Sequence, residues 1–141
     1  MTESRGFLVD SNVLLDIITR DAVWSAWSEQ ALAGALRSGE VWLNPIVYAE
    51  VSLAFASITA QNAALPPDIL RRAPLPFAAG FLAARAHQAY RKRGGTRATT
   101  LPDFFVGAHA VVDRLTLVTR DARRYRTAFP GLALMAPDRE E

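Results

Sequence analysis

The chain has 141 residues, a length typical of one domain with its own hydrophobic core, and it contains no cysteine with which to form a disulfide. Sixteen basic and fourteen acidic residues give a net charge of +2, and the single lysine, Lys92, argues against enzymes that need a catalytic lysine. The apolar run before Asp10 is too short for a signal peptide, and no run reaches the roughly 20 apolar residues of a membrane span. We therefore expect one cytoplasmic domain over residues 1–141, with a frayed tail from about residue 137.

A short apolar run at residues 7–9 ends on Asp10 and passes directly into a helical pattern. That pattern is carried by Val13, Leu14, Ile17 and Ile18. It indicates a buried strand that feeds a helix almost without a loop. Because ligands of parallel sheets bind beyond the carboxyl ends of the strands, Asp10 is a candidate site residue. The alternative is that Asp10 or Ser11 only caps the helix.

The rest of the chain alternates between helical and strand patterns. Residues 61–76 hold four of the eight prolines and predict a loop with at most one helical turn. In chain order the other predicted elements are a helix at 24–36, a strand at 41–43, helices at 46–55, 77–91 and 102–113, a strand at 115–118, a short helix at 122–127 and a last strand at 132–135. This order predicts a three-layer α/β/α sandwich with a mostly parallel central sheet.

Glu50 is the only charged residue between positions 41 and 67. Helical spacing places it on one apolar face with Ile46, Val47 and Val51. An acid on such a face is costly unless it is paired or binds a metal, so Glu50 is a candidate functional acid. The alternative is a buried glutamate that an arginine satisfies.

Two further acids stand at the ends of predicted elements. Asp103 opens its helix in the spacing Thr100-x-x-Asp103, which is also that of a capping box. Asp121 follows the strand at 115–118 in the way that Asp10 follows the first strand. Right-handed crossovers would bring both strand ends to the same edge of the sheet.

Together these four acids predict a divalent metal site. Two carboxylates about 4 Å apart repel by roughly 4 kcal/mol at an effective dielectric constant near 20, so a group of four requires a cation. An all-oxygen site favours Mg²⁺ or Mn²⁺, which can support hydrolysis of a phosphodiester. Without the four acids the chain has ten acidic and sixteen basic residues, a net charge of +6 that suits a polyanionic substrate.

Several basic residues and histidines have two interpretations. The segment 90–97 combines basic residues, Tyr90 and two glycines, which suits phosphate contact, although a solvated helix end also favours cations. We interpret Arg123, Arg124 and Arg126 as a solvated face, with RNA contact as the alternative. The two histidines, His87 and His109, are expected to pack rather than to bind metal.

Four blocks of the chain together resemble the PIN-domain ribonucleases, most of all the VapC-type toxins of bacterial toxin–antitoxin pairs. The blocks are Asp10-Ser11-Asn12-Val13-Leu14-Leu15-Asp16, Glu50 in its helix, Pro102-Asp103-Phe104-Phe105-Val106-Gly107-Ala108-His109-Ala110, and Thr119-Arg120-Asp121-Ala122-Arg123-Arg124-Tyr125 with Phe129-Pro130. The resemblance extends from about Phe7 to Leu134, and it depends on the order and spacing of all four blocks.

This resemblance implies a PIN-like fold and a metal-dependent ribonuclease. It makes Asp10, Glu50, Asp103 and Asp121 the catalytic acids that bind Mg²⁺ or Mn²⁺. Ser11, Asn12 and Thr119 match the supporting polar positions, and Asp16 matches a recurrent acid better suited to pairing helices than to binding metal. The family also implies an RNA substrate, a cognate antitoxin whose tail blocks the pocket, and a homodimer. The candidates for RNA contact are Arg93, Arg97 and Arg120.

Three other functions compete with this interpretation. A haloacid-dehalogenase-like phosphatase needs Asp-x-Asp, whereas position 12 is Asn12, and its later lysine has no counterpart outside the basic loop. A phospho-acceptor receiver domain needs an adjacent acid pair and a lysine after a late strand. A PIN-like scaffold that binds RNA or a protein without cleavage is the main alternative.

Overall fold

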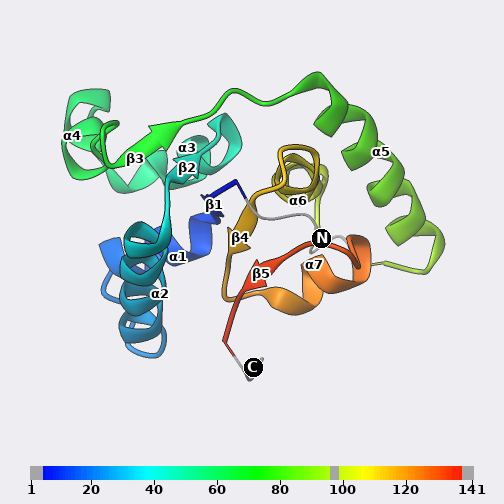
Figure 1. Cartoon of the computed structure of the whole chain (residues 1–141), viewed down its shortest axis with the longest axis horizontal. Coiled ribbons are helices and arrows are strands. Elements are labelled where there is room, and N and C mark those ends of the chain that lie inside the picture. The colour runs from blue at the N-terminus through cyan, green and yellow to red at the C-terminus, as the bar shows by residue number, and fades with distance from the viewer. Residues whose placement is uncertain (1–4, 96–98, 138–141) are drawn as a thin grey trace.

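The structure, a computed structural model, describes residues 5–95 and 99–137, and its centre is a five-stranded sheet (Figure 1). The strands lie in the order β3-β2-β1-β4-β5, and every neighbouring pair is parallel. The strands are β1 (Phe7–Val9), β2 (Val41–Leu43), β3 (Leu70–Arg72), β4 (Thr116–Val118) and β5 (Leu134–Met135). The predicted α/β sandwich is therefore confirmed, with a sheet that is parallel throughout.

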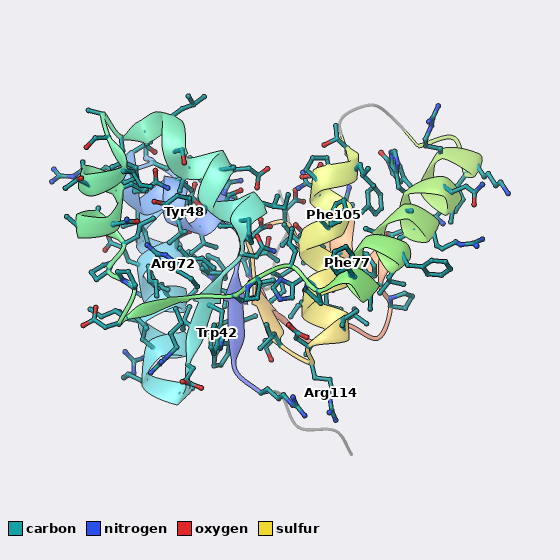
Figure 2. All side chains as sticks on the ribbon, turned by 90° about the horizontal axis from the view of Figure 1, so that it is seen from above. Trp42, Tyr48, Arg72, Phe77, Phe105 and Arg114 are labelled. Carbon is teal, nitrogen blue, oxygen red and sulfur yellow. The ribbon has the colours of Figure 1, made fainter. Side chains whose placement is uncertain are left out.

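Helices cover both faces of this sheet. They are α1 (Ser11–Ile18), α2 (Ser25–Ser38), α3 (Pro45–Val51), α4 (Ile58–Ala64), α5 (Phe77–Lys92), α6 (Leu101–Val112) and α7 (Ala122–Ala128), with a 3₁₀ turn, η1 (Ser52–Ala54), after α3. In Figures 1 and 2, α1 and α2 lie on one side of the central strands, and α5 and α6 lie on the other. Among the described residues no helix has the length and apolar character needed to cross a membrane.

The two central strands, β1 and β4, are short, and the last two residues of each are buried. Leu8 and Val9 of β1 and Leu117 and Val118 of β4 have no exposed surface. Val9 pairs with Val118, and the Asp10 amide donates to the Val118 carbonyl at 2.9 Å. Because the strands are parallel and in this register, the residues that follow β1 and β4 meet at one edge of the sheet.

The prediction of a loop over residues 61–76 is wrong. Helix α4 begins at Ile58, where the Ser57 hydroxyl accepts from the amide of Ala60, and β3 pairs with β2 at the edge of the sheet. The prolines lie outside these two elements rather than within them. Strand β3 is only three residues long and carries two arginines, so the sequence offers little apolar alternation by which to find it.

The third predicted helix also ends earlier than expected. Helix α3 starts as predicted, with the Asn44 side chain accepting from the amide of Val47 and Pro45 in the first turn. It ends at Val51 and tightens into η1 instead of running to Phe55. Glu50 therefore lies in the last turn of a two-turn helix, next to the edge of the sheet that carries Asp10.

Candidate active site

Asp10 is buried at the carboxyl end of β1, and its carboxylate accepts four hydrogen bonds. Its Oδ1 accepts from the amide of Ser11 at 2.8 Å, as the cap of α1. Its Oδ2 accepts from the hydroxyls of Thr119 and Tyr125, both at 2.9 Å, and from the side-chain amide nitrogen of Asn12 at 3.3 Å. Burial raises the pKa of Asp10, and the bonds from Tyr125, Thr119 and Ser11 oppose that rise. One oxygen of Asp10 thus caps α1, while the other accepts hydrogen bonds from Asn12, Thr119 and Tyr125.

The polar residues expected to support the site join β1 to β4. The Asn12 amide nitrogen also donates to the Thr119 hydroxyl at 3.2 Å, and its oxygen accepts from the amide of Arg120 at 3.3 Å. The Thr119 hydroxyl accepts from the amide of Asp121 at 3.0 Å. These bonds fix the loop that carries Asp121 against the loop that carries Asp10.

Glu50 is exposed, so the prediction that it lies on a buried apolar face is wrong. Helix α3 buries Val47 and Val51, and Glu50 stands about 100° around the helix from Val51. Partial burial of its carboxyl end raises the pKa of Glu50, a bond from the Ser11 side chain lowers it, and the charges of Asp10 and Asp103 raise it further. Glu50 therefore interacts with the other acids from the rim of the site.

Asp103 combines the capping role with a place in the acidic group. Its Oδ2 accepts from the Thr100 amide at 2.7 Å and from the Thr100 hydroxyl at 3.1 Å, which forms the predicted capping box of α6. Its Oδ1 accepts from Arg124 Nη1 at 3.1 Å. The two oxygens of Asp103 thus have separate partners.

Arg124 connects two of the predicted acids, and the prediction that it lies on a solvated face is wrong. Its Nη1 pairs with Asp103 and its Nη2 lies 2.9 Å from Asp121 Oδ2, with only 26% of the arginine side chain exposed. Burial opposes the charged form of Arg124, but the surrounding groups, Asp103 first, outweigh it and raise its pKa. The acidic group therefore contains a cation of its own.

The donor atoms at this edge of the sheet suit a hard divalent ion. The acids offer carboxylate oxygens and Thr119 offers a hydroxyl, which are the ligand types that Mg²⁺ and Mn²⁺ prefer. Across the two described ranges, however, no three acidic or histidine side chains are close enough to form a ready metal cluster. The fold brings Asp10, Glu50 and Asp103 within electrostatic reach of one another, and Arg124 joins Asp103 to Asp121.

The three arginines predicted to contact RNA differ in their surroundings. Arg120 Nε pairs with the buried Asp16 at 2.8 Å, and its guanidinium lies 5.6 Å from the ring centre of Trp24. Arg93 is exposed and lines a cavity of about 320 Å³ that Asp121 and Arg124 also line. Arg97 lies outside the described residues, as do tail residues 138–141. Asp16 also accepts from Ser28 of α2 at 2.8 Å, so it pairs helices as expected.

The contacts of the two histidines are with residues other than the four predicted acids. His109 is fully buried, with Nδ1 3.1 Å from the Asn44 amide and Nε2 2.9 Å from Asp113 Oδ2. Burial lowers its pKa, while Asp113 acts in the opposite direction. The ring of His87 lies 5.2 Å from that of Phe104. Both histidines therefore pack, as predicted.

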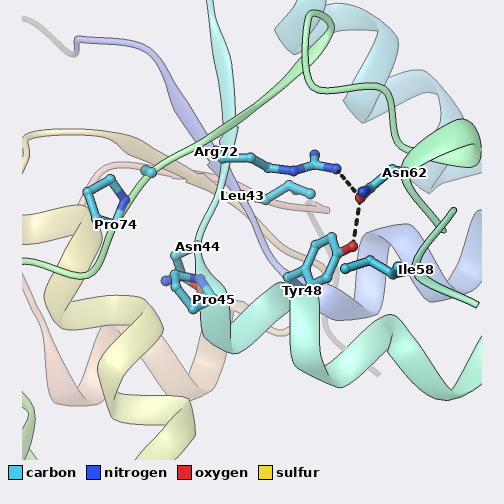
Figure 3. Close-up of a pocket in the computed structure, with 9 residues that line it drawn as sticks. Leu43, Asn44, Pro45, Tyr48, Ile58, Asn62, Arg72 and Pro74 are labelled. Carbon is cyan, nitrogen blue, oxygen red and sulfur yellow. Dashed lines mark hydrogen bonds between the residues drawn. The ribbon is translucent and has the colours of Figure 1, made fainter.

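A larger cavity of about 540 Å³ lies between α3, α4 and the end of β3 (Figure 3). The Asn62 side-chain oxygen accepts from the Tyr48 hydroxyl at 2.6 Å and from Arg72 Nη2 at 3.0 Å. Arg72 also donates to the carbonyl of Leu65 at 2.7 Å. These bonds join β3 to α4, and none of the four predicted acids lines this cavity.

Sequence reasoning missed Tyr125 and the pairing role of Arg124. Tyr125 is almost fully buried, and burial raises its pKa well above the ordinary value, so its hydroxyl keeps the proton that it donates to Asp10. A tyrosine beside arginines gives no local signal of a contact 115 residues away. The one indication in the sequence that Tyr125 lies near the site was its position four residues, about one helical turn, after Asp121.

The family model of the PIN domain matches residues 7–130. The chain belongs to the PIN-domain family. The family resemblance found in the sequence is thereby confirmed. No curated protein sequence gives a significant match.

Solved structures of other proteins share this PIN fold. VapBC2 from Rickettsia felis, bound to a promoter DNA fragment, is 16% identical with a TM-score of 0.71, over 94% of this chain and 98% of that one. FitAcB from Neisseria gonorrhoeae is 19% identical with a TM-score of 0.65, over 92% and 96%. A toxin–antitoxin complex from Klebsiella pneumoniae is 19% identical with a TM-score of 0.67, over 96% and 100%. At these identities the similarity establishes the fold alone.

Proposed function

We propose that this PIN domain is an endoribonuclease that uses Mg²⁺ or Mn²⁺ to hydrolyse RNA phosphodiesters. The observation that supports this most is the placement of acids around one edge of the sheet, where burial raises the pKa of Asp10 and of Glu50, and repulsion by Asp10 and Asp103 raises that of Glu50 further. A divalent cation would relieve that repulsion. The proposed catalytic and metal-binding residues are Asp10, Glu50, Asp103 and Asp121.

Asp10 and Glu50 would have different parts in this site. When bound, the metal would activate a water and polarise the phosphate. Asp10 is held in one orientation by four hydrogen bonds, which suits a fixed ligand. Glu50 lies at the exposed rim, where solvent and RNA can reach it. Thr119 and Asn12 hold Asp121 against Asp10, and Ser11 orients Glu50.

The basic surface suits an RNA substrate. The exposed Arg93 lines the cavity beside Asp121, so it can contact a phosphate next to the cleaved bond. We also propose phosphate contacts for Arg97 and Arg120. The pairing of Arg120 with Asp16 gives that arginine a structural role in addition.

We further propose that the chain is the toxin of a toxin–antitoxin pair and works in the cytoplasm. The support is its PIN family together with a fold shared with VapBC2, FitAcB and the Klebsiella pneumoniae toxin–antitoxin complex. The proposed partners are an antitoxin that blocks the acidic site and a second copy of this chain in a homodimer.

The test is cleavage of single-stranded RNA by the purified chain. We expect cleavage with Mg²⁺ or Mn²⁺, none with EDTA, and a loss of at least about a hundredfold in Asp10→Asn. Asp113→Asn, which changes an acid outside the proposed site, is the matched control and should cleave as the wild type does. Undiminished cleavage by Asp10→Asn would refute the mechanism. RNA binding without any cleavage would favour the scaffold alternative.

A further inference from the structure

Arg124 occupies positions at the acidic site that a metal ion would need. Its guanidinium spans Asp103 Oδ1 at 3.1 Å and Asp121 Oδ2 at 2.9 Å. The other oxygen of Asp103 already accepts two hydrogen bonds from Thr100. The oxygen of Asp103 that remains for a metal is therefore the one that Arg124 holds.

The positive charge of Arg124 neutralises part of the negative charge that a metal ion would otherwise neutralise. The Arg124 guanidinium also interacts electrostatically with Asp10, so this one cation stabilises the charges of three of the acids. Glu50 is likewise influenced by Arg124. A divalent cation that binds Asp103 Oδ1 and Asp121 Oδ2 competes with both ion pairs, because a carboxylate oxygen cannot serve both partners at full strength.

The structure gives Arg124 room to leave. About a quarter of its side chain is exposed, and it borders the cavity of about 320 Å³ that Arg93 and Thr127 also line. The next residue, Tyr125, is anchored by its hydroxyl to Asp10 at 2.9 Å. The Arg124 side chain can therefore swing into the cavity while α7 stays fixed at Tyr125.

We propose that Arg124 is the built-in competitor of the divalent cation, a positioning residue that lowers the metal affinity of the free protein. The inference rests on the proposed function, since it assumes that Asp103 and Asp121 are metal ligands. In the metal-free protein Arg124 holds the acids together. Metal binding releases it into the neighbouring cavity, on the side where Arg93 lies.

The test compares Mn²⁺ binding by isothermal titration calorimetry in the wild type and in Arg124→Gln. We expect the variant to bind Mn²⁺ about tenfold more tightly, because two partly exposed ion pairs no longer compete. Arg124→Lys, which keeps the charge but can reach fewer oxygens, should fall between them. The matched control is Arg126→Gln, which removes the same charge from the exposed side of α7 and should bind as the wild type does.

Thermal unfolding supplies a second measurement. In EDTA, Arg124→Gln should melt a few degrees below the wild type, since its acids have lost their cation, and Mn²⁺ should raise its Tm by more than it raises that of the wild type. Equal or weaker Mn²⁺ binding by Arg124→Gln would overturn the proposal. If Asp10→Asn still abolished Mn²⁺ binding in that case, the proposed nuclease site would stand without it. If no variant bound Mn²⁺, both proposals would fail.

Discussion

At the scale of single residues, several acids of this PIN domain serve the fold and the proposed site at once. Asp10 caps α1 with one oxygen and receives three side-chain donors on the other. Asp103 caps α6 with one oxygen and pairs with Arg124 through the other. Both acids therefore cap their helices, as the alternative interpretation predicted, and each has a second oxygen that contacts other residues of the proposed site.

Residue-level electrostatics lead to a prediction about pH. Asp10 and Glu50 have pKa values raised above their ordinary 3.8 and 4.5. Over the pH range just above these ordinary values the native state keeps protons that the unfolded state has lost. Without metal, these two groups therefore make the free energy of unfolding fall as the pH rises through that range. Substituting Glu50→Gln should lessen this fall in the free energy of unfolding and raise the Tm at neutral pH by about 1–3 °C. The expected change in Tm is small because solvent screens the charge of the exposed Glu50.

The measurement is thermal unfolding in EDTA over a series of pH values. Glu40→Gln is the control, because it removes an exposed carboxylate that pairs with Arg71 instead of the acidic group. We expect the Tm values of the two variants to depend differently on pH. Identical pH profiles for Glu50→Gln and Glu40→Gln would contradict it.

The residue scale also marks the limit of what the sequence could predict. The acids and the polar residues beside them were identified from their positions at strand ends and from the family resemblance. Neither the exposure of Glu50 nor the partners of Arg124 could be predicted that way. Both depend on how α3 and α7 are rotated against the sheet, which is decided by packing between distant segments.

At the scale of elements, the close approach of α6 and α7 sets the position of Tyr125. An added Cβ at Gly107 of α6 would lie 2.4 Å from Phe129 Cε2 and 3.0 Å from Tyr125 Cδ1. Only glycine leaves room there for both rings. Because the Tyr125 hydroxyl donates to Asp10, this helix contact extends to the proposed site.

We predict that Gly107→Ala destabilises the protein by about 1–3 kcal/mol, although alanine favours helices, because the rings must move. Gly34→Ala in α2 is the matched control. Its new Cβ would meet only Arg37 Nη2 at 3.7 Å, so it should stabilise by about 0.5–1 kcal/mol. Urea unfolding measures both variants. Two shifts of the same sign would show that the α6–α7 contact is looser than described.

Helices and strands were predicted correctly where their apolar residues follow a clear helical or strand spacing. Strands β1, β2 and β4 and the long helix α5 carry continuous apolar runs or helical spacing, so their positions were predicted closely. Strand β3 was missed because it is short, polar and at an edge. Its last residue, Arg72, donates to the Leu70 carbonyl and to the side chain of Asn62 in α4, and sequence spacing does not reveal these contacts.

At the scale of the whole molecule, parallel pairing of β1 with β4 is what brings distant acids to one edge. Asp10 and Thr119 are 109 residues apart in sequence and bonded at 2.9 Å. The sheet and its crossover helices fix this arrangement, while α3 and α6 add Glu50 and Asp103 from either side. Apart from these four acids, the chain carries a net charge of +6.

Crystals of the protein soaked in Mn²⁺ would show whether these acids together bind one or more divalent cations. Anomalous scattering should locate Mn²⁺ with oxygen ligands from Asp10 and at least one of Asp103 and Asp121, with the Arg124 side chain displaced. Mn²⁺ located elsewhere would show that these acids are not the metal site, and Arg124 still bridging Asp103 and Asp121 at saturating Mn²⁺ would show that it does not compete with the metal.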